Sequence, residues 1–471
     1  MPVAPRTRRP VTRALLLALT SVLFAGRAAR AEASPPRRTN LLLVTADDLN
    51  GDSAGWMGGT AIPTPALDAL AAESHRFVNA HVTAPICQPS RAALLTGRVP
   101  HRSGAMGFDP IRDDVPTLVE VLRARGYFTA AINKLEHMSP PAKFPWDLAL
   151  RGSGKRPAAL RAQVARCLEA ADRAGRPFLI NANLTDPHRP FRQVRAAGHG
   201  GPRSQILQVP AFLEDLAPVR AELAAYFSSV ARLDRGLAMV LDALAASGHA
   251  DDTVVVFLSD NGMSFPFAKA TVYQSGTWTP TVLRYPGMRP PADHEEMVSS
   301  VDLMPTLLEL LDVPPPSGMD GRSWGPLLRG EVQPLRDAVV THVNTVSGGA
   351  FFPQRCVRTR SRSLLWQPWA DGRTHLDVEA LHGLAFRGLR HAARHDDRLA
   401  RRVRQLVDGV PLALYDLQRD PGERRNLIHL PGYRADVERL QAALATHMVR
   451  TGDPELGSFR AAVAGWRAAA R

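Results

Sequence analysis

One segment carries the clearest chemical signal in the chain: residues 87–98 read CQPSRAALLTGR. Pro89 and Ser90 are good first-turn residues for a helix, which predicts that Cys87 lies at a helix N-terminus. Free backbone N–H groups and the helix dipole favour anions at that position. Arg91, one turn further along, can reach back toward the same spot as a fixed cation. A lone cysteine is usually inert packing, but this setting favours a nucleophilic centre that handles an anion.

Polar side chains follow four apolar runs at residues 41–44, 128–132, 178–184 and 253–258. Each run is short and does not alternate, which is typical of a buried parallel strand. The polar groups that follow are Asp47 and Asp48, then Lys134 and His137, then Asp186, Pro187 and His188, and last Asp260, Asn261 and Gly262. Any one such group could be a helix cap. Open α/β sheets bind ligands at the carboxyl edge, so the four groups and Cys87 together predict one site.

The oxygen-bearing members of this set suit a hard divalent cation. Asp47, Asp48, Asp260 and Asn261 offer only oxygen ligands, which Ca²⁺ and Mg²⁺ prefer over zinc or copper. The three cysteines show no zinc-binding spacing. If Cys87 is modified, Cys167 and Cys356 could pair with each other in an oxidising compartment.

Helical patterns between the apolar runs predict an α/β sheet covered by helices on both faces. One helix is expected from residues 64–65 onward, a long one over residues 219–244, and an apolar one around residues 303–311. Proline and glycine at 314–318 interrupt the pattern. We expect a large domain over residues 38–330 and a smaller α+β domain over residues 331–471. The smaller domain should contain a strand at 363–366, a solvated helix rich in arginine and histidine at 386–405, and a terminal helix carrying Val437 to Met448.

The N-terminus and the overall charge indicate an exported protein. Arginines precede an apolar stretch at residues 14–26, and small residues follow, so residues 1–31 are predicted to be a secretory signal peptide rather than a membrane span. The Arg8-Arg9 pair leaves twin-arginine export open. Removing six arginines lowers the formal net charge from +13 to +7, because this segment has no acidic residue. A basic exported protein without a nucleic-acid-binding motif is expected in the periplasm or outside the cell, with a polyanion other than nucleic acid as partner.

Residues 87–98 resemble the active-site signature of the type I sulfatases, the formylglycine-dependent family. Further similar segments lie at 300–306, 321–323, 414–417, 420–421 and 426–427. The resemblance implies an alkaline-phosphatase-like α/β domain and oxidation of Cys87 to formylglycine by a separate maturation enzyme. It also implies that the hydrated aldehyde is the nucleophile, and that calcium is held with one oxygen of residue 87. A sulfated saccharide then becomes the expected substrate.

Within that family, two segments are most similar to the heparan N-sulfatases. These are residues 185–189 and 260–269, and the second places Lys269 where those enzymes carry a basic residue. The resemblance implies that Lys134, His188 and Lys269 neutralise the sulfuryl oxygens. It assigns to His188 the donation of a proton to the departing oxygen or nitrogen. The remaining hydroxyl of residue 87 is expected to lose its proton with help from His137 or a metal-ligand aspartate.

Two departures leave the substrate open. Lys134 precedes His137 by three residues, a spacing more like that of iduronate-2-sulfatases, and residues 273–278 lack the arylsulfatase pattern. Simple aryl sulfates are therefore not expected as natural substrates. We predict hydrolysis of a sulfate ester or sulfamate on a sulfated glycan, with N-sulfoglucosamine favoured. The alternatives are a glycan O-sulfatase of the iduronate-2-sulfate or glucosamine-6-sulfate type, a phosphonate or phosphodiester hydrolase, and a non-catalytic glycan-binding protein. The sequence gives no oligomeric state.

Overall fold

An eight-stranded mixed sheet forms the centre of the computed structural model, which describes residues 39–152, 155–191, 208–334 and 336–469. The predicted signal peptide lies outside these residues. In spatial order the strands are β5 (Leu148–Leu150), β4 (Phe128–Ile132), β6 (Phe178–Pro187), β1 (Asn40–Asp47), β7 (Thr253–Ser259), β8 (Thr281–Arg284), β2 (His75–Phe77) and β9 (Asp293–His294). A two-stranded sheet pairs β3 (Ala80–His81) with β10 (Val298–Ser299).

The four strands predicted from apolar runs are all present and lie together as β4, β6, β1 and β7, parallel to one another. Every residue of β1, β4 and β7 is buried, which explains why their sequences do not alternate. The antiparallel pairs β7–β8 and β8–β2 make the sheet mixed.

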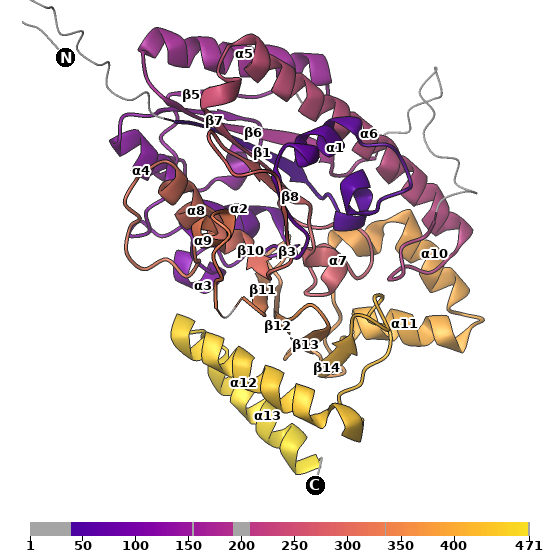
Figure 1. Cartoon of the computed structure of the whole chain (residues 1–471). Helices are drawn as coiled ribbons and strands as arrows, with labels where there is room; N and C mark the ends of the chain where they lie inside the picture. The colour runs from indigo at the N-terminus through magenta and orange to yellow at the C-terminus, as the bar shows by residue number, and fades with distance from the viewer. Residues whose placement is uncertain (1–38, 153–154, 192–207, 335, 470–471) are drawn as a thin grey trace, which may run out of the picture. The chain divides into compact units, whose positions relative to one another are not determined.

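Helices cover both faces of this sheet, as predicted (Figure 1). One face packs against α1 (Pro65–Ala72), α5 (Pro157–Ala174) and α6 (Ala217–Ala246). The other face packs against α2 (Cys87–Thr96), α4 (Leu118–Ala124), α8 (Leu303–Leu310) and α9 (Gly325–Leu328). Two short helices, α3 (Pro100–Ser103) and α7 (Gln274–Thr277), lie in the connections. Neighbouring leucines of β1 divide between the two cores, Leu42 on the first face and Leu43 on the second.

A second sheet of four antiparallel strands follows in the sequence. Its order is β11 (Val339–Thr345), β12 (Phe351–Arg358), β13 (Arg362–Trp366) and β14 (Leu412–Asp416). One face is covered by α12 (Arg434–Thr451) and α13 (Leu456–Ala469), with the expected Val437 and Met448 buried (Figure 1). Residues on its other face belong to the same apolar core as α6. These elements are compatible with the predicted boundary near residue 330, which stays a prediction.

The expected single helix at residues 386–405 is wrong. Two helices occur there, α10 (Leu384–Ala392) and α11 (Asp397–Val407). The break arises because the Asp396 carboxylate accepts hydrogen bonds from the backbone N–H groups of Arg398 and Leu399, which starts a new helix. These helices are also more than a solvated face, since Phe386 and Leu406 are buried in the core beside α6.

The remaining cysteines do not form the pair that the sequence left open. Cys167 in α5 and Cys356 in β12 are both buried and free. Within the described part of the chain, we find no helix with the length and apolar character needed to cross a membrane.

Candidate active site

The carboxyl ends of the parallel strands bring the predicted polar residues to one edge of the sheet. In the β1–β7 pairing Ala46 lies opposite Ser259, so the residues that follow, Asp47 and Asp260, emerge side by side. Asp48 has a backbone φ of 70°, in the left-handed region that side chains other than glycine rarely adopt. This turn breaks the alternation of an extended strand, so that Asp47 and Asp48 both reach the same site.

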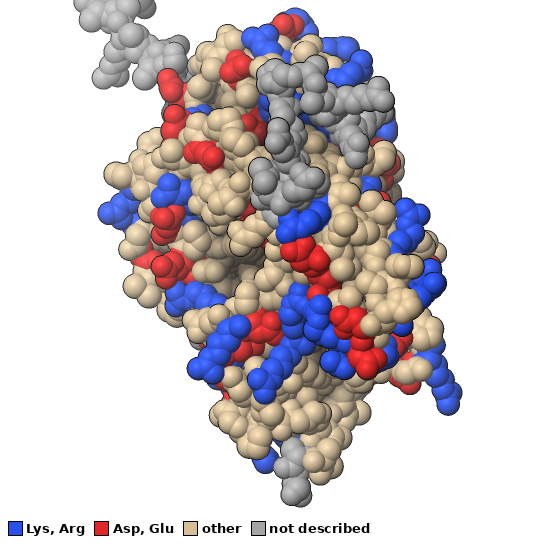
Figure 2. Space-filling view, turned by 90° about the vertical axis from the view of Figure 1, so that its right-hand side faces the viewer, with Lys and Arg blue, Asp and Glu red and all other residues tan. Residues whose placement is uncertain are grey.

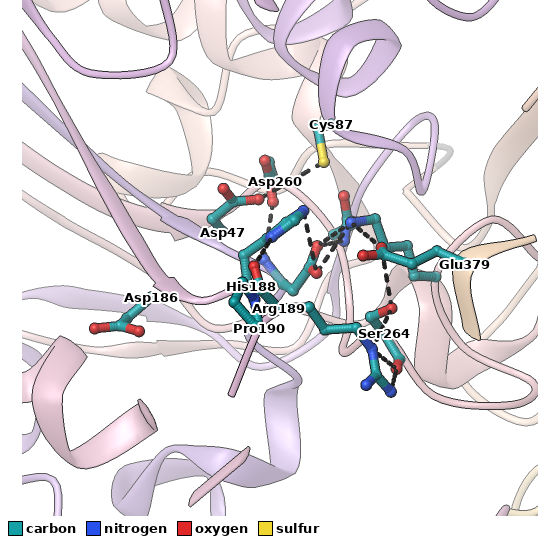
Figure 3. Close-up of polar contacts among 12 residues, drawn as sticks. Asp47, Cys87, Asp186, His188, Arg189, Pro190, Asp260, Ser264 and Glu379 are labelled. Atoms are coloured by element: carbon teal, nitrogen blue, oxygen red, sulfur yellow. Dashed lines mark hydrogen bonds and ion pairs between the residues drawn. The ribbon is translucent and has the colours of Figure 1, made fainter. Parts of the chain in front are cut away.

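Cys87 is the first residue of α2, as predicted, and its side chain faces the strand ends (Figure 3). Its Sγ lies 3.6 Å from Asp47 Oδ1. One turn on, Arg91 is buried and binds across the strand ends rather than to solvent. Its Nη2 donates to Asp260 Oδ2 at 2.7 Å, and its Nη1 donates to Asn183 Oδ1 at 2.6 Å and to Thr45 Oγ1 at 3.1 Å. The guanidinium is therefore fixed on two sides before any ligand binds.

Two lysines contact the two neighbouring aspartates. Lys134 forms an ion pair with Asp47. Lys269 Nζ lies 2.9 Å from Asp48 Oδ1, and the Asn261 side-chain amide donates to the same oxygen at 2.7 Å. Both lysines are nearly buried, with 9% of each side chain exposed, so their charges act through little water.

The two predicted histidines differ in their surroundings. His188 Nδ1 lies 2.6 Å from the carbonyl oxygen of Arg189, which can only accept, so Nδ1 carries the hydrogen. Its Nε2 points toward the aspartates and lies 4.0 Å from Asp48 Oδ2. His137 lies in a short 3₁₀ helix after β4, and its buried Nδ1 has no hydrogen-bond partner among the described residues. Burial, then the charges of Lys134 and Arg91, lower the pKa of His137 to about 4.

Asp186 does not join the cluster. It accepts hydrogen bonds from Arg232 at 2.8 and 3.0 Å, and Figure 3 shows it apart from Cys87 and Asp260. The other members of the predicted set occupy the same edge.

The donor set fits the predicted divalent cation. Asp47, Asp48, Asp260 and Asn261 are at most 2% exposed, and Asn261 Oδ1 is buried without a hydrogen-bond donor among the described residues. Burial, then the nearby Asp47 carboxylate, raise the pKa of Asp260 to about 6. Burial also works against the charge of Asp47, but Lys134, His188 and Arg91 outweigh it and lower the pKa of Asp47. Crowded carboxylate oxygens and an orphaned amide oxygen are what a hard cation would neutralise and satisfy.

The encoded thiol is poorly suited to act as a nucleophile itself. Burial raises the pKa of Cys87 well above 9.0, with Lys269 opposing the shift and the aspartates adding to it. The thiolate is the reactive form of cysteine, so the unmodified side chain stays in its unreactive form near neutral pH.

Several residues at the site were not predicted from sequence. Thr45 and Asn183 hold Arg91 from within β1 and β6, and a polar residue inside an otherwise apolar strand was the signal that could have found them. Glu379 comes from the second half of the chain, and its carboxylate contacts Lys269 Nζ at 3.3 Å. Nothing in its surrounding sequence marked it.

Comparison with known proteins agrees with this geometry. The family model described as Sulfatase matches residues 39–142 and 153–313. The chain is 31% identical to human N-sulphoglucosamine sulphohydrolase over 468 residues, covering 89% of this chain and 91% of the relative.

This chain belongs to the sulfatase family. The matched region carries Cys87, Arg91 and all four candidate metal ligands of this sulfatase. Hydrolysis of sulfate esters or sulfamates is the activity of the family.

Solved structures show the alkaline-phosphatase-like fold of this sulfatase. One is a protein in complex with its substrate D-glucosamine-2-N,6-O-disulfate, with a TM-score of 0.69, 18% identity, and coverage of 89% of this chain and 99% of the other. Another is a phosphonate monoester hydrolase from Silicibacter pomeroyi, with a TM-score of 0.67, 20% identity, and coverage of 89% and 97%. At these identities the likeness concerns the fold alone.

Proposed function

We propose that this sulfatase removes sulfate from a sulfated glycan, with the sulfamate of N-sulfoglucosamine as the favoured target. The observation that carries the proposal is the convergence of Cys87, Arg91, Lys134, Lys269 and His188 on one buried edge of the sheet. The 31% identity to human N-sulphoglucosamine sulphohydrolase, over most of both chains, supports the choice of substrate.

The proposed chemistry divides between the chain and two groups that it would carry. When present, Ca²⁺ on Asp47, Asp48, Asp260 and Asn261 would supply a Lewis acid, and formylglycine at position 87 would supply a geminal hydroxyl as nucleophile. The family implies both groups, and Mg²⁺ is the alternative cation. A maturation enzyme would have to oxidise Cys87.

The residues of the chain then bind the anion and move protons. Lys134 and Lys269 offer positive charge to the sulfuryl oxygens from a nearly dry setting, where it is strongest. Arg91 keeps residue 87 and Asp260 in fixed relation. His188 holds one hydrogen at Nδ1, so Nε2 is the atom that takes up a second proton and, from the resulting imidazolium, donates it to the departing nitrogen or oxygen.

His137 is proposed as the base that accepts a proton from the second hydroxyl of residue 87. Its lowered pKa, about 4, keeps the imidazole neutral at neutral pH, the form that can accept a proton. Its unpartnered Nδ1 is the candidate acceptor atom.

We also propose that the protein is exported by its N-terminal 31 residues and that residues 331–471 form a second domain that shapes the substrate pocket.

Basic and acidic side chains alternate on the face shown in Figure 2 instead of merging into one basic surface. That pattern favours recognition of a glycan at the buried cationic site rather than along a broad charged surface.

Two other functions keep specific support. The three-residue separation of Lys134 and His137 favours a glycan O-sulfatase of the iduronate-2-sulfate type. The fold is shared with the phosphonate monoester hydrolase, so a phosphorus ester is the other substrate class to test.

Sulfate release tests these functions against each other. The protein would be produced together with a formylglycine-generating enzyme and given N-sulfoglucosamine, 6-O-sulfated N-acetylglucosamine, an iduronate-2-sulfate and an aryl phosphonate in calcium buffer. We expect sulfate from the first substrate at the highest kcat/KM. Preferential cleavage of either O-sulfate would make the enzyme an O-sulfatase with the same site, and preferential cleavage of the phosphonate would overturn the proposal.

A further inference from the structure

Glu379 brings a carboxylate from the second half of the chain to the cationic site. Its Oε2 lies 3.3 Å from Lys269 Nζ and accepts a hydrogen bond from Ser264 Oγ at 3.2 Å. Lys269 also contacts Asp48, so this lysine connects the candidate metal ligands on one side to Glu379 on the other. Figure 3 shows Glu379 and Ser264 beside the cluster that contains Asp47, Asp260 and Cys87.

The segment that carries Glu379 is held firmly in place. Its neighbours Val378 and Ala380 are 5% and 3% exposed and belong to the core that includes α6. The α10 helix begins shortly afterwards, and its backbone N–H groups at Leu384 and Ala385 donate to Glu222 of α6 at 3.0 and 2.6 Å. Glu379 is therefore presented by a packed segment, and not by a free surface loop.

The carboxylate remains available to a ligand. Both contacts described above use Oε2, and 38% of the side chain is exposed, whereas the side chains of Asp48 and Lys269 are 0% and 9% exposed. Burial works against its ionisation, but Lys269, then His188, lower the pKa of Glu379 below its ordinary value. At neutral pH it is a negative charge at the outer side of the anion-binding lysine.

A fixed negative charge beside a site for an anion affects which sugars can bind there. The reacting sulfuryl group lies against Lys134 and Lys269 in the proposed function, so the sugar ring that bears it has to lie on the open side of the site, where Glu379 is the more exposed neighbour of Lys269. A carboxylate there accepts hydrogen bonds from hydroxyl groups and repels a second sulfate or carboxylate.

We propose that Glu379 is a specificity-determining residue that selects a sugar bearing a single sulfate, with neutral hydroxyl groups on the ring that faces it. This inference rests on the proposed function and adds the substrate class: a monosulfated sugar, against its disulfated analogues.

The test compares substrates that share the reacting N-sulfate. The kcat/KM values for N-sulfoglucosamine, its 6-O-sulfated derivative and its 3-O-sulfated derivative are measured for the wild type and for Glu379→Gln. For each protein, the kcat/KM for the monosulfated sugar is divided by the kcat/KM for a disulfated derivative. This ratio cancels any general effect of the substitution on Lys269. We expect a preference for the monosulfated sugar over at least one derivative, and a drop of about tenfold in that ratio for Glu379→Gln. A tenfold change in the ratio corresponds to about 1.4 kcal/mol. Two unit charges about 6 Å apart repel each other by about this energy at a dielectric constant of about 40.

Asp377→Asn is the matched control, because Asp377 lies in the same segment but pairs with the exposed His382 at 2.8 Å. The ratio of kcat/KM values for the monosulfated and disulfated sugars should be the same for Asp377→Asn as for the wild type. Dissociation constants for the same sugars, measured with Cys87→Ala and with Cys87→Ala combined with Glu379→Gln, should show the same change in ratio without turnover. Sulfate release with ratios that Glu379→Gln leaves unchanged would overturn this inference alone. If the wild type released sulfate from none of these sugars, the proposed function would fail and the inference with it.

Discussion

Three histidines lie around a buried ion pair near the end of α12. Arg355 donates to both oxygens of Asp453, at 2.6 and 2.9 Å, and both side chains are fully buried. His342 Nδ1 and His101 Nδ1 lie 3.7 and 4.0 Å from Asp453 Oδ2. His342 Nε2 lies 3.1 Å from Nε2 of His447, which belongs to α12.

These histidines are held neutral by the fold. Burial, then the Arg355 charge, lower the pKa of His342 well below 6.5, and burial, then Arg450, lower the pKa of His447 to about 3. Burial also lowers the pKa of His101, although Asp453 opposes the shift. The unfolded chain therefore binds more protons than the folded chain once the pH falls below about 6.5. Because the folded pKa of each histidine is the lower one, the stability that depends on these three residues is fully present above pH 6.5 and declines as the pH falls.

Replacement of His447 by Gln measures this effect. Each histidine that stays neutral in the folded protein lowers the protein's free energy of unfolding by about 1.3 kcal/mol between pH 7.0 and pH 5.5. The ring of His447 is partly exposed, so this figure is its upper value. We expect urea unfolding to show a loss between these two pH values that is smaller by about 1 kcal/mol in His447→Gln than in the wild type. Exposed His391 provides the control, and His391→Gln should keep the wild-type loss. An equal loss in His447→Gln and the wild type would refute the reasoning.

Two further predictions concern the candidate site. Arg91→Lys keeps the positive charge, but a lysine cannot span Asp260 and Asn183. We expect turnover per matured chain to fall about 100-fold with Cys87 still converted. Turnover within twofold of the wild type would contradict this role. Calcium should raise the melting temperature of the wild type but not that of Asn261→Ala, whose lost amide oxygen is a candidate ligand. A calcium-induced increase of the same size in both proteins would place the cation elsewhere.

The sheet and much of the candidate site could be predicted because short-range patterns determine them. The apolar runs of β1, β4, β6 and β7 are buried on both faces, and parallel strands must end at one edge. Once those strands are placed, Asp47, Asp260 and Lys134 have to lie near one another. The position of Cys87 followed from the helix-starting residues after it.

The remainder depends on contacts between distant segments, which local patterns do not encode. Asp186 has the same strand-end position as the other polar residues, yet Arg232 of α6 binds it away from the cluster. Glu379 reaches Lys269 across 110 positions of sequence. The break between α10 and α11 depends on one capping carboxylate inside a segment with a continuous helical pattern.

Conversion of Cys87 tests the central claim most directly. Preparations made with increasing amounts of a formylglycine-generating enzyme would be analysed by mass spectrometry of tryptic peptide 77–91 and assayed for sulfate release from N-sulfoglucosamine. The account predicts that the rate of release is proportional to the fraction of chains with the aldehyde at position 87, and that Cys87→Ala releases no sulfate. Equal rates from unconverted and converted protein, or turnover by Cys87→Ala, would contradict it.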